Sequence, residues 1–528
     1  ERVYALYATP ALMPRFKPAT MSESDPRPVG SPEPFYRWAA GAIVDSRKQK
    51  VARELAPNQF AVGISGGAEA MVHACSRDAL ENPELDFLSP DVKNAYCEVE
   101  RVECICDMIE FDPFLGLVTT AVYTVPTTYV YVSKDGSHFI METLDGVIQG
   151  DPIGMNAFCM SYRKPTSWIS TCLQAAASGK TQLDSHSFPH PPPVRVKECM
   201  QDWLEKNRVE KMPASTRVIN RQFADNGVFA VCSELAEAVP SLAEICLSVK
   251  GLQFKKSWDI WAQTPRNYSH PDFKMRKPEE GLVVLGGLVH STECTEVEIL
   301  IGTNTFLSKH VETLSSKIEG VSVEFEKVVE LAAQAHHAER LCFKVFANTM
   351  KQRVTYFLRV FPPEVSTKVA ERLDDIFRRT TAKILGWTEA EVAEAASQAE
   401  LHPEDGGHGA SSTAELAPLL HLASWLSTTH EHSLKSSESF AVIPLSEFFE
   451  AGEFSQKMQN LYLQVRKIND SLPDSFENFV KQVLATKSFL KRTKSGKKVI
   501  WQRALAKGMR EVKVEKWKKS ASDEQRER

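Results

Sequence analysis

The sequence predicts an α+β protein with several domains, and three local patterns support this. Two apolar runs separated by Asp225-Asn226-Gly227 predict an antiparallel hairpin, because asparagine and glycine tolerate the positive φ angles of a tight turn. An apolar run that ends near Asp91 predicts a strand leading into a helix. From Thr305 to Trp387, apolar residues recur at helical spacing. Taken alone, the first pattern predicts only a hairpin.

The N-terminal part of the chain predicts a strand, a helix and a loop. Residues 1–20 are typical of a strand with prolines at its end, and residues 34–55 of a helix. Residues 57–74 form a glycine-rich loop that opens a helix. This loop lacks the Lys-Ser/Thr pair of a phosphate-binding P-loop, so a nucleotide hydrolase is not expected. We interpret the loop as structural or as a template contact.

The middle of the chain carries a turn and an insertion. A Gly/Pro-marked turn over residues 145–154 precedes an apolar helix start at residues 155–162. Residues 178–193 are rich in Ser, His and Pro, a composition that favours extended, solvated chain. We expect His186 and His190 to be loop residues rather than metal ligands.

The C-terminal part predicts helices followed by a basic tail. Pro362 and Pro363 predict a helix break, because proline cannot continue a helix. Residues 414–485 predict further amphipathic helices. From Lys487 onward, Lys and Arg alternate with Phe489, Trp501 and other apolar residues. Such a run is often only a solvated face, but basic and aromatic residues together also bind RNA, and both interpretations stay open.

Composition limits the class of protein. Hydrophobic residues make up 43% of the chain and charged residues 25%, as in ordinary soluble globular proteins. No run approaches the roughly 18 apolar residues of a membrane span. Eleven scattered cysteines predict reduced thiols in an intracellular protein, and the sequence does not distinguish the nucleus from the mitochondrion. The net charge of −5 argues against tight duplex binding by the core. Because the chain begins with Glu1, we expect residues upstream.

Five segments, in this order, resemble the palm of reverse transcriptases of the non-LTR retroelement (retrotransposon) type. They are Leu88–Tyr96, Gln149–Pro152, Phe223–Asn226, Val249–Lys256 and Leu285–Gly287. The resemblance implies a right-hand polymerase fold, in which the palm combines an antiparallel sheet with helices. It implies fingers at 1–87, a palm at 88–292 with an insertion near 178–193, a helical thumb at 293–410, and a helical C-terminal region with a basic tail at 411–528.

The resemblance also implies a nucleotidyltransferase site. Asp91 and Asp225 would be the catalytic carboxylates and the ligands of Mg²⁺ or Mn²⁺. Asn226 stands where the family has a second hairpin aspartate. The residues implied in substrate binding are Arg27, Lys17, Tyr96, Gln149, Gly150 and Lys255. The basic tail would contact nucleic acid through Lys491, Arg492, Lys494, Lys497, Lys498 and Trp501.

The asparagine leaves two main hypotheses. Two-metal transfer needs anionic oxygen ligands, and Asn226 keeps an oxygen but removes a charge, which at about 4 Å can weaken ion binding by a few kcal/mol. Some viral RNA polymerases resemble this site in using Asp-Asn. The chain is then either an RNA-directed DNA polymerase, working or weakened, that uses an RNA template and a DNA primer, or a catalytically silent, domesticated scaffold. The scaffold would be a subunit of a large ribonucleoprotein, such as a mitochondrial ribosome, with protein partners. A protein-interaction module without RNA is a third possibility.

Overall fold

The computed structural model describes most of the chain. The described residues are 11–15, 27–64, 66–132, 137–209, 217–289, 351–385, 387–399, 412–433, 448–450, 452–485, 490–493 and 496–499, with scattered positions at 316–330 and 505–519. They divide into two compact units. The first comprises Glu1–Met71 and Asn82–Pro278, and the second Val72–Glu81 and Glu279–Arg528. Among the described helices, each is too short or too polar to cross a bilayer.

The first unit is built on a five-stranded sheet. Its order is β6 (Ile219–Phe223), β7 (Asn226–Val231), β3 (Asp86–Ser89), β8 (Trp258–Ala262) and β9 (Phe273–Arg276). The central strand β3 is antiparallel to both β7 and β8, and β9 is parallel to β8. Residues 227–231 of β7 are all buried, because both faces of the strand are covered.

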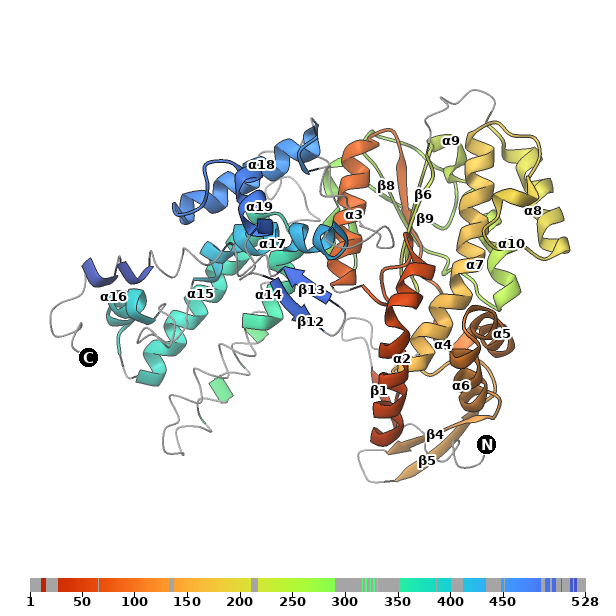
Figure 1. Ribbon diagram of the computed structural model, residues 1–528, viewed down its shortest axis with the longest axis horizontal. Helices are drawn as coiled ribbons and strands as arrows, with labels where there is room; N and C mark the ends of the chain where they lie inside the picture. The colour runs from red at the N-terminus through yellow and green to blue at the C-terminus, as the bar shows by residue number, and fades with distance from the viewer. Residues whose placement is uncertain are drawn as a thin grey trace. The chain divides into compact units, whose positions relative to one another are not determined.

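Helix α7 (Pro152–Ala177) is the hub of the first unit (Figure 1). It contacts β6, α2 (Pro34–Leu55), α4 (Ala95–Glu98), α5 (Arg101–Phe111), α8 (Val194–Asn207), α9 (Ser233–Ala236) and α10 (Val239–Leu247). The predicted helix at 34–55 is confirmed as α2. The predicted helix at 155–162 is also confirmed, although α7 begins at Pro152, where a proline suits the first helical position.

A second sheet lies in the same unit. Its order is β2 (Arg27–Ser31), β1 (Ala11–Arg15), β4 (Thr127–Val132) and β5 (His138–Thr143). Strand β1 lies in the stretch where the sequence predicts a strand. The helix pair α5 and α6 (Pro113–Tyr123) precedes β4. The backbone N–H of Gly30 in β2 donates to the carbonyl of Gln149 at 2.9 Å, which joins this sheet to the turn before α7.

The inserted loop 178–193 contains only a short 3-10 turn, η1 (Ser185–Ser187), and is largely exposed as predicted. It is nevertheless fixed to the core, because Leu183 and Phe188 are buried. The Trp168 indole N–H on α7 also donates to the His190 carbonyl at 2.6 Å. The described residues contain no group of three or more His, Cys, Asp or Glu placed to hold a metal ion, in this loop or elsewhere.

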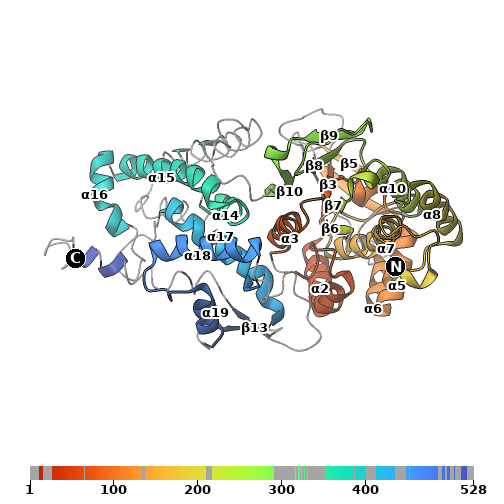
Figure 2. The ribbon, with the colours of Figure 1, turned by 90° about the horizontal axis from the view of Figure 1, so that it is seen from above.

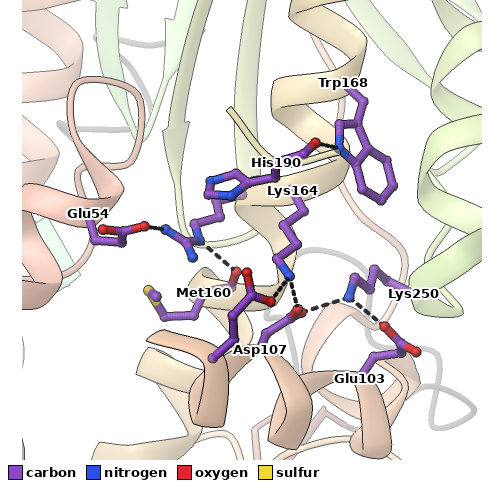
Figure 3. A network of polar contacts seen from close by, with 10 residues as sticks. Glu54, Glu103, Asp107, Met160, Lys164, Trp168, His190 and Lys250 are labelled. Carbon is purple, nitrogen blue, oxygen red and sulfur yellow. Dashed lines mark hydrogen bonds and ion pairs between the residues drawn. The ribbon is translucent and has the colours of Figure 1, made fainter. Parts of the chain in front are cut away.

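A buried charge network ties α5 to α7 and to the 3-10 turn η2 (Ser248–Lys250). Figure 3 shows Lys164 and Lys250 on either side of Asp107, and each ammonium lies 2.7 Å from an oxygen of that carboxylate. Glu110 and Glu103 at the rim pair with the same two lysines. A buried carboxylate between two ammonium groups is satisfied only while all three are present, so the network fixes how these elements pack.

The second unit is mainly helical (Figure 2). Helix α17 (Thr413–Ser433) contacts α14 (Lys351–Val360), α15 (Pro363–Leu385) and α18 (Glu453–Ile468). Helix α16 (Glu389–Ala399) packs on α15, and α19 (Phe476–Ala485) on α18. The break at Pro362-Pro363 is confirmed, since α14 ends at Val360 and α15 begins at Pro363. The predicted helices over 414–485 are likewise confirmed by α17, α18 and α19.

Two hairpins belong to the second unit. The first pairs β10 (Leu282–Val284) with β11 (Gly287–Val289), and both turn residues, Leu285 and Gly286, have positive φ. The second pairs β12 (Leu490–Thr493) with β13 (Gly496–Val499). The prediction of a wholly helical basic tail is therefore wrong for 490–499.

Two buried histidines lie in the second unit. His73, in the middle of α3 (Gly67–Glu81), has its Nε2 2.8 Å from the Ser424 hydroxyl and stacks on Trp425. The Trp425 indole N–H donates to His421 Nε2 at 3.1 Å, and His421 Nδ1 lies 2.9 Å from the Arg359 carbonyl. Burial lowers the pKa of both imidazoles, that of His421 to about 3. Both rings are therefore neutral in the folded protein.

Acidification is expected to destabilise the protein through His421. Its folded-state pKa of about 3 lies below the unfolded value of roughly 6.5. The stability contributed by the neutral ring is complete above about pH 6.5 and is lost as the pH falls toward 3, by up to about 1.4 kcal/mol per pH unit. Urea unfolding of the full chain between pH 7.5 and 5 should show a smaller pH slope for His421→Gln than for the native chain. His186→Gln, in the exposed loop, should keep the native slope. Equal slopes for the native chain and His421→Gln would contradict the assignment.

Candidate functional site

Three chain segments meet just beyond the end of β3. Within the β3–β7 ladder Leu88 lies opposite Phe229, and three positions further on Asp91 forms an antiparallel bridge with Asn226. On the other side of Asp91, the backbone N–H of Lys255 donates to the Asp91 carbonyl at 2.8 Å. Asp91 therefore lies between Asn226 and Lys255 through backbone pairing alone.

The predicted β6–β7 hairpin is present, but its turn differs from the predicted one. The turn residues are Ala224 and Asp225, and Asn226 pairs with Phe223 as the first residue of β7. Ala224 has a φ of 52°, which is strained for a residue with a Cβ. Gly227 is held in the ladder instead, where an added Cβ would lie 2.5 Å from the Gln222 side chain.

A tertiary contact from Gln59 stabilises this turn. The Ala224 backbone N–H donates to Gln59 Oε1 at 2.7 Å, and Gln59 Nε2 donates back to the Ala224 carbonyl at 3.3 Å. Backbone bonds between Gln222 and the residues flanking Gln59, Asn58 and Phe60, add the loop to the edge of β6. The start of the glycine-rich loop thus has a structural role, and the template contact stays a prediction.

The two carboxylates face the same helix. Burial is the largest cause of the raised pKa of the Tyr162 phenol on α7, and the charges of Asp225 and Asp91 both raise it further. Asp225 also contributes to the raised pKa values of Tyr96 and Cys159, after burial. Because Asp91 also forms a bridge with Asn226, the residue after Asp225, the two carboxylates lie in one region although they are far apart in the sequence.

An aromatic stack lies beneath the carboxylates. Tyr96 stacks on Phe158 with ring centroids 4.8 Å apart, and Phe158 stacks on Tyr162 at 5.3 Å. Only 9% of Tyr96 is exposed, and the buried Tyr162 hydroxyl has no hydrogen-bond partner among the described residues. The implied role of Tyr96 in substrate binding stays a prediction, since most of its ring is covered.

Asp91 forms an ion pair with Lys255 at the centre of the site. Lys255 Nζ donates to Asp91 Oδ2 at 2.5 Å, and about a third of each side chain is exposed (36% and 35%). Asn226 Nδ2 lies 3.5 Å from Oδ1 of its neighbour in the chain, Asp225. Each carboxylate therefore has a positively charged or hydrogen-bond-donating group of the chain beside it.

The turn before α7 makes mainly internal contacts. The Gln149 carbonyl accepts the Gly30 N–H, and Gly150 has a φ of 109°. The buried Asp151 carboxylate caps α7 through the Ile153 N–H and accepts hydrogen bonds from the Tyr36 and Tyr123 hydroxyls. Burial raises the pKa of Asp151, and these hydrogen bonds oppose the rise.

Several residues that hold the site were not singled out from the sequence. Asp151 had a usable signal, because an aspartate directly before proline and an apolar run is typical of a helix N-cap. Gln59 and Tyr162 had none, because their contacts join segments far apart in the chain.

Other predicted site residues are not brought to this region by any described contact. Arg27 is on β2 opposite Arg15. Lys491, Arg492, Lys497 and Lys498 are on β12 and β13. Lys17, Lys494 and Trp501 lie outside the described residues. The predicted roles of all these residues stay predictions.

Comparison with known proteins gives no match in sequence and a weak match in structure. No protein-family model matches the chain, and no curated protein matches it in sequence. Among solved structures, the chain is similar to telomerase from Candida albicans, determined in complex with the TWJ fragment of telomeric RNA. The identity is 12%, the TM-score 0.31, and the match covers 68% of this chain and 54% of that telomerase chain. The chain thus spans about half the length of that protein.

The side chains of Asp91, Asp225 and Asn226 can be compared with the ligands that two divalent ions need. Such ions need several anionic oxygens at short range. Here one oxygen of Asp91 accepts a hydrogen bond from the Lys255 ammonium group. Asn226 offers an amide in place of a carboxylate, and its nitrogen lies near Asp225. In this arrangement the residues do not fit a two-ion site, and the use of Mg²⁺ or Mn²⁺ stays a prediction.

Replacing Ala224 by glycine should relieve the strained turn. Glycine adopts positive φ without a steric cost, so Ala224→Gly should leave the protein as stable as the native chain or stabilise it by up to about 1 kcal/mol. Ala230→Gly, in the buried interior of β7, should instead destabilise it by at least about 0.5 kcal/mol. The two free energies of unfolding are measured in urea. Equal destabilisation by both substitutions would show that the turn carries no strain.

Proposed function

We propose that the chain is an RNA-binding protein derived from a reverse transcriptase, with a right-hand polymerase fold in which nucleotidyl transfer is weakened or lost. The observation that supports this best is the bridge between Asp91, just beyond the end of β3, and Asn226, the residue that follows Asp225 in the β6–β7 turn. The proposal keeps the fingers at 1–87, the palm at 88–292, the thumb at 293–410 and the C-terminal region at 411–528.

The N-terminal end of α2 offers a candidate contact for single-stranded RNA. Phe35 and Trp38 are each 77% exposed, and the exposed Arg37 lies between them in sequence. Exposed aromatic rings three residues apart lie on one side of a helix, where bases can stack on them. The helix has a basic excess, with Arg37, Arg47, Lys48, Lys50 and Arg53 against Asp45 and Glu54. The basic hairpin β12–β13 would add phosphate contacts.

Two observations favour the silent scaffold over a working polymerase. Asn226 removes one of the negative charges that hold metal ions in the related enzymes. The Lys255 ammonium balances the charge of Asp91. In this form the protein would be a subunit of a large ribonucleoprotein, such as a mitochondrial ribosome, in the nucleus or the mitochondrion. RNA and protein partners would then replace the template and the DNA primer.

RNA binding tests the proposal directly. The full chain should bind single-stranded RNA, and the double variant Phe35→Ala/Trp38→Ala should bind at least about fivefold more weakly, since one stacked base is worth about 1–3 kcal/mol. Fluorescence anisotropy with a labelled oligoribonucleotide measures this. Leu117→Ala, on α6, removes a similarly exposed apolar side chain (66% exposed) that has no ring and should leave the affinity unchanged. No RNA binding by the native chain would refute the proposal and leave the protein-interaction module.

Primer extension separates the two forms of the proposal. On an RNA template with a DNA primer and Mg²⁺ or Mn²⁺, we expect the native chain to give no extension above the Asp225→Ala background. Asn226→Asp introduces the negative charge that the reverse transcriptase family has at this position, and it is assayed in parallel. Extension by the native chain that Asp225→Ala abolishes would identify a working polymerase. No extension by the native chain or by Asn226→Asp would support the scaffold.

A further inference from the structure

We propose that Lys255 is a resident cation of the carboxylate site, which takes the place of a divalent ion at Asp91. The inference rests on the site of the proposed function and goes further. It identifies the group that competes with metal ions there, and it makes metal binding depend on the release of one ion pair.

The position of Lys255 is fixed by the backbone. Its N–H donates to the Asp91 carbonyl at 2.8 Å, its neighbour Phe254 forms a bridge with Val92, and the Lys93 N–H donates to the Gln253 carbonyl at 2.9 Å. The lysine stem therefore starts beside the residue that its ammonium contacts. Such a lysine differs from a mobile surface lysine, whose ion pairs contribute little.

The approach to this segment is also constrained. Gly251, which follows η2, has a φ of 68°, and an added Cβ there would lie 2.9 Å from the Glu98 carbonyl oxygen. Leu252 is buried, and the ring of Phe254 packs edge-to-face on Trp258 at 4.9 Å. The segment that carries Lys255 is thus held on both sides of the lysine by packing rather than by the ion pair.

The charges explain why the lysine and a divalent ion exclude each other. Asp91 and Asp225 carry one negative charge each, Lys255 carries one positive charge, and Asn226 carries none, which leaves a net charge of −1 at the site. Lys255 Nζ lies 2.5 Å from Asp91 Oδ2, and a Mg²⁺ ion would bind that oxygen at about 2.0–2.1 Å, so the ammonium and the ion need the same place beside it. A divalent ion there would meet a cation at close range, so the ammonium must leave first.

The exclusion is competitive rather than absolute. About a third of each side chain is exposed, so the lysine can turn into solvent without unfolding its segment. Removing the ammonium should then raise the affinity for a divalent ion, and the gain should require Asp91.

Binding of Mn²⁺ alone, without RNA or nucleotide, tests this inference. The full-length native chain and its variants are titrated with Mn²⁺, and free hexaaqua Mn²⁺ is followed by electron paramagnetic resonance. Lys255→Met keeps the stem but removes the charge, and should bind Mn²⁺ at least tenfold more tightly than the native chain. The double variant Lys255→Met/Asp91→Asn should lose this gain. Unchanged affinity in Lys255→Met, or a gain that survives Asp91→Asn, would overturn the inference.

Two further variants show whether the effect depends on the position of the lysine and on its charge. Lys256→Met removes the exposed neighbouring lysine and should stay within about twofold of the native affinity. Lys255→Arg keeps the charge and should also remain native-like. A gain in either variant equal to that of Lys255→Met would refute the role of the Lys255 charge. Circular dichroism and the urea midpoint confirm that each variant is folded.

The result is independent of the test of RNA binding. Failure of the proposed function would appear as a native chain that binds no RNA. Failure of the present inference would appear as an unchanged Mn²⁺ affinity in Lys255→Met, whatever the affinity for RNA.

Discussion

The antiparallel pairing of β3 with β7 determines the rest of the first unit. Phe87 and Leu88 of β3 and the run Val228–Val231 of β7 are fully buried. A shift of one residue would turn every side chain of one strand to the opposite face, so packing on both faces fixes the register. The same register places Asp91 opposite Asn226. The position of the candidate site is therefore a consequence of the core, and the charges of the site contribute little to it.

Features that depend on neighbouring residues could be predicted from the sequence. The helix α2, the break before Pro363 and the existence of the β6–β7 hairpin follow from local periodicity and from proline. The turn of that hairpin could not be predicted, because Gln59, far away in the chain, stabilises Ala224 at positive φ. A local preference for Asn-Gly is worth less than this contact together with the close packing of Gly227.

The residues of the candidate site could be named from the sequence, but their contacts could not. Resemblance to reverse transcriptases implied roles for Asp91, Asp225 and Lys255, with the lysine in substrate binding. In the structure the ammonium contacts Asp91, because residues 253–255, which precede β8, pair with Asp91–Lys93, which follow β3. Which oxygen meets which cation depends on such long-range geometry. A sequence pattern carries no information about it.

Fold and chemistry are separable in this protein for a physical reason. Asn226 takes part in the ladder through its backbone, so exchanging aspartate for asparagine at this position changes the charge of the site and leaves the pairing intact. The aromatic stack of Tyr96, Phe158 and Tyr162 likewise supports the site through packing. The backbone pairing and this packing can thus stay the same while the charge of the site changes, because different interactions maintain the two. The arrangement of Asp91 and Asp225 does not by itself establish an activity, which has to be argued from the charges around them.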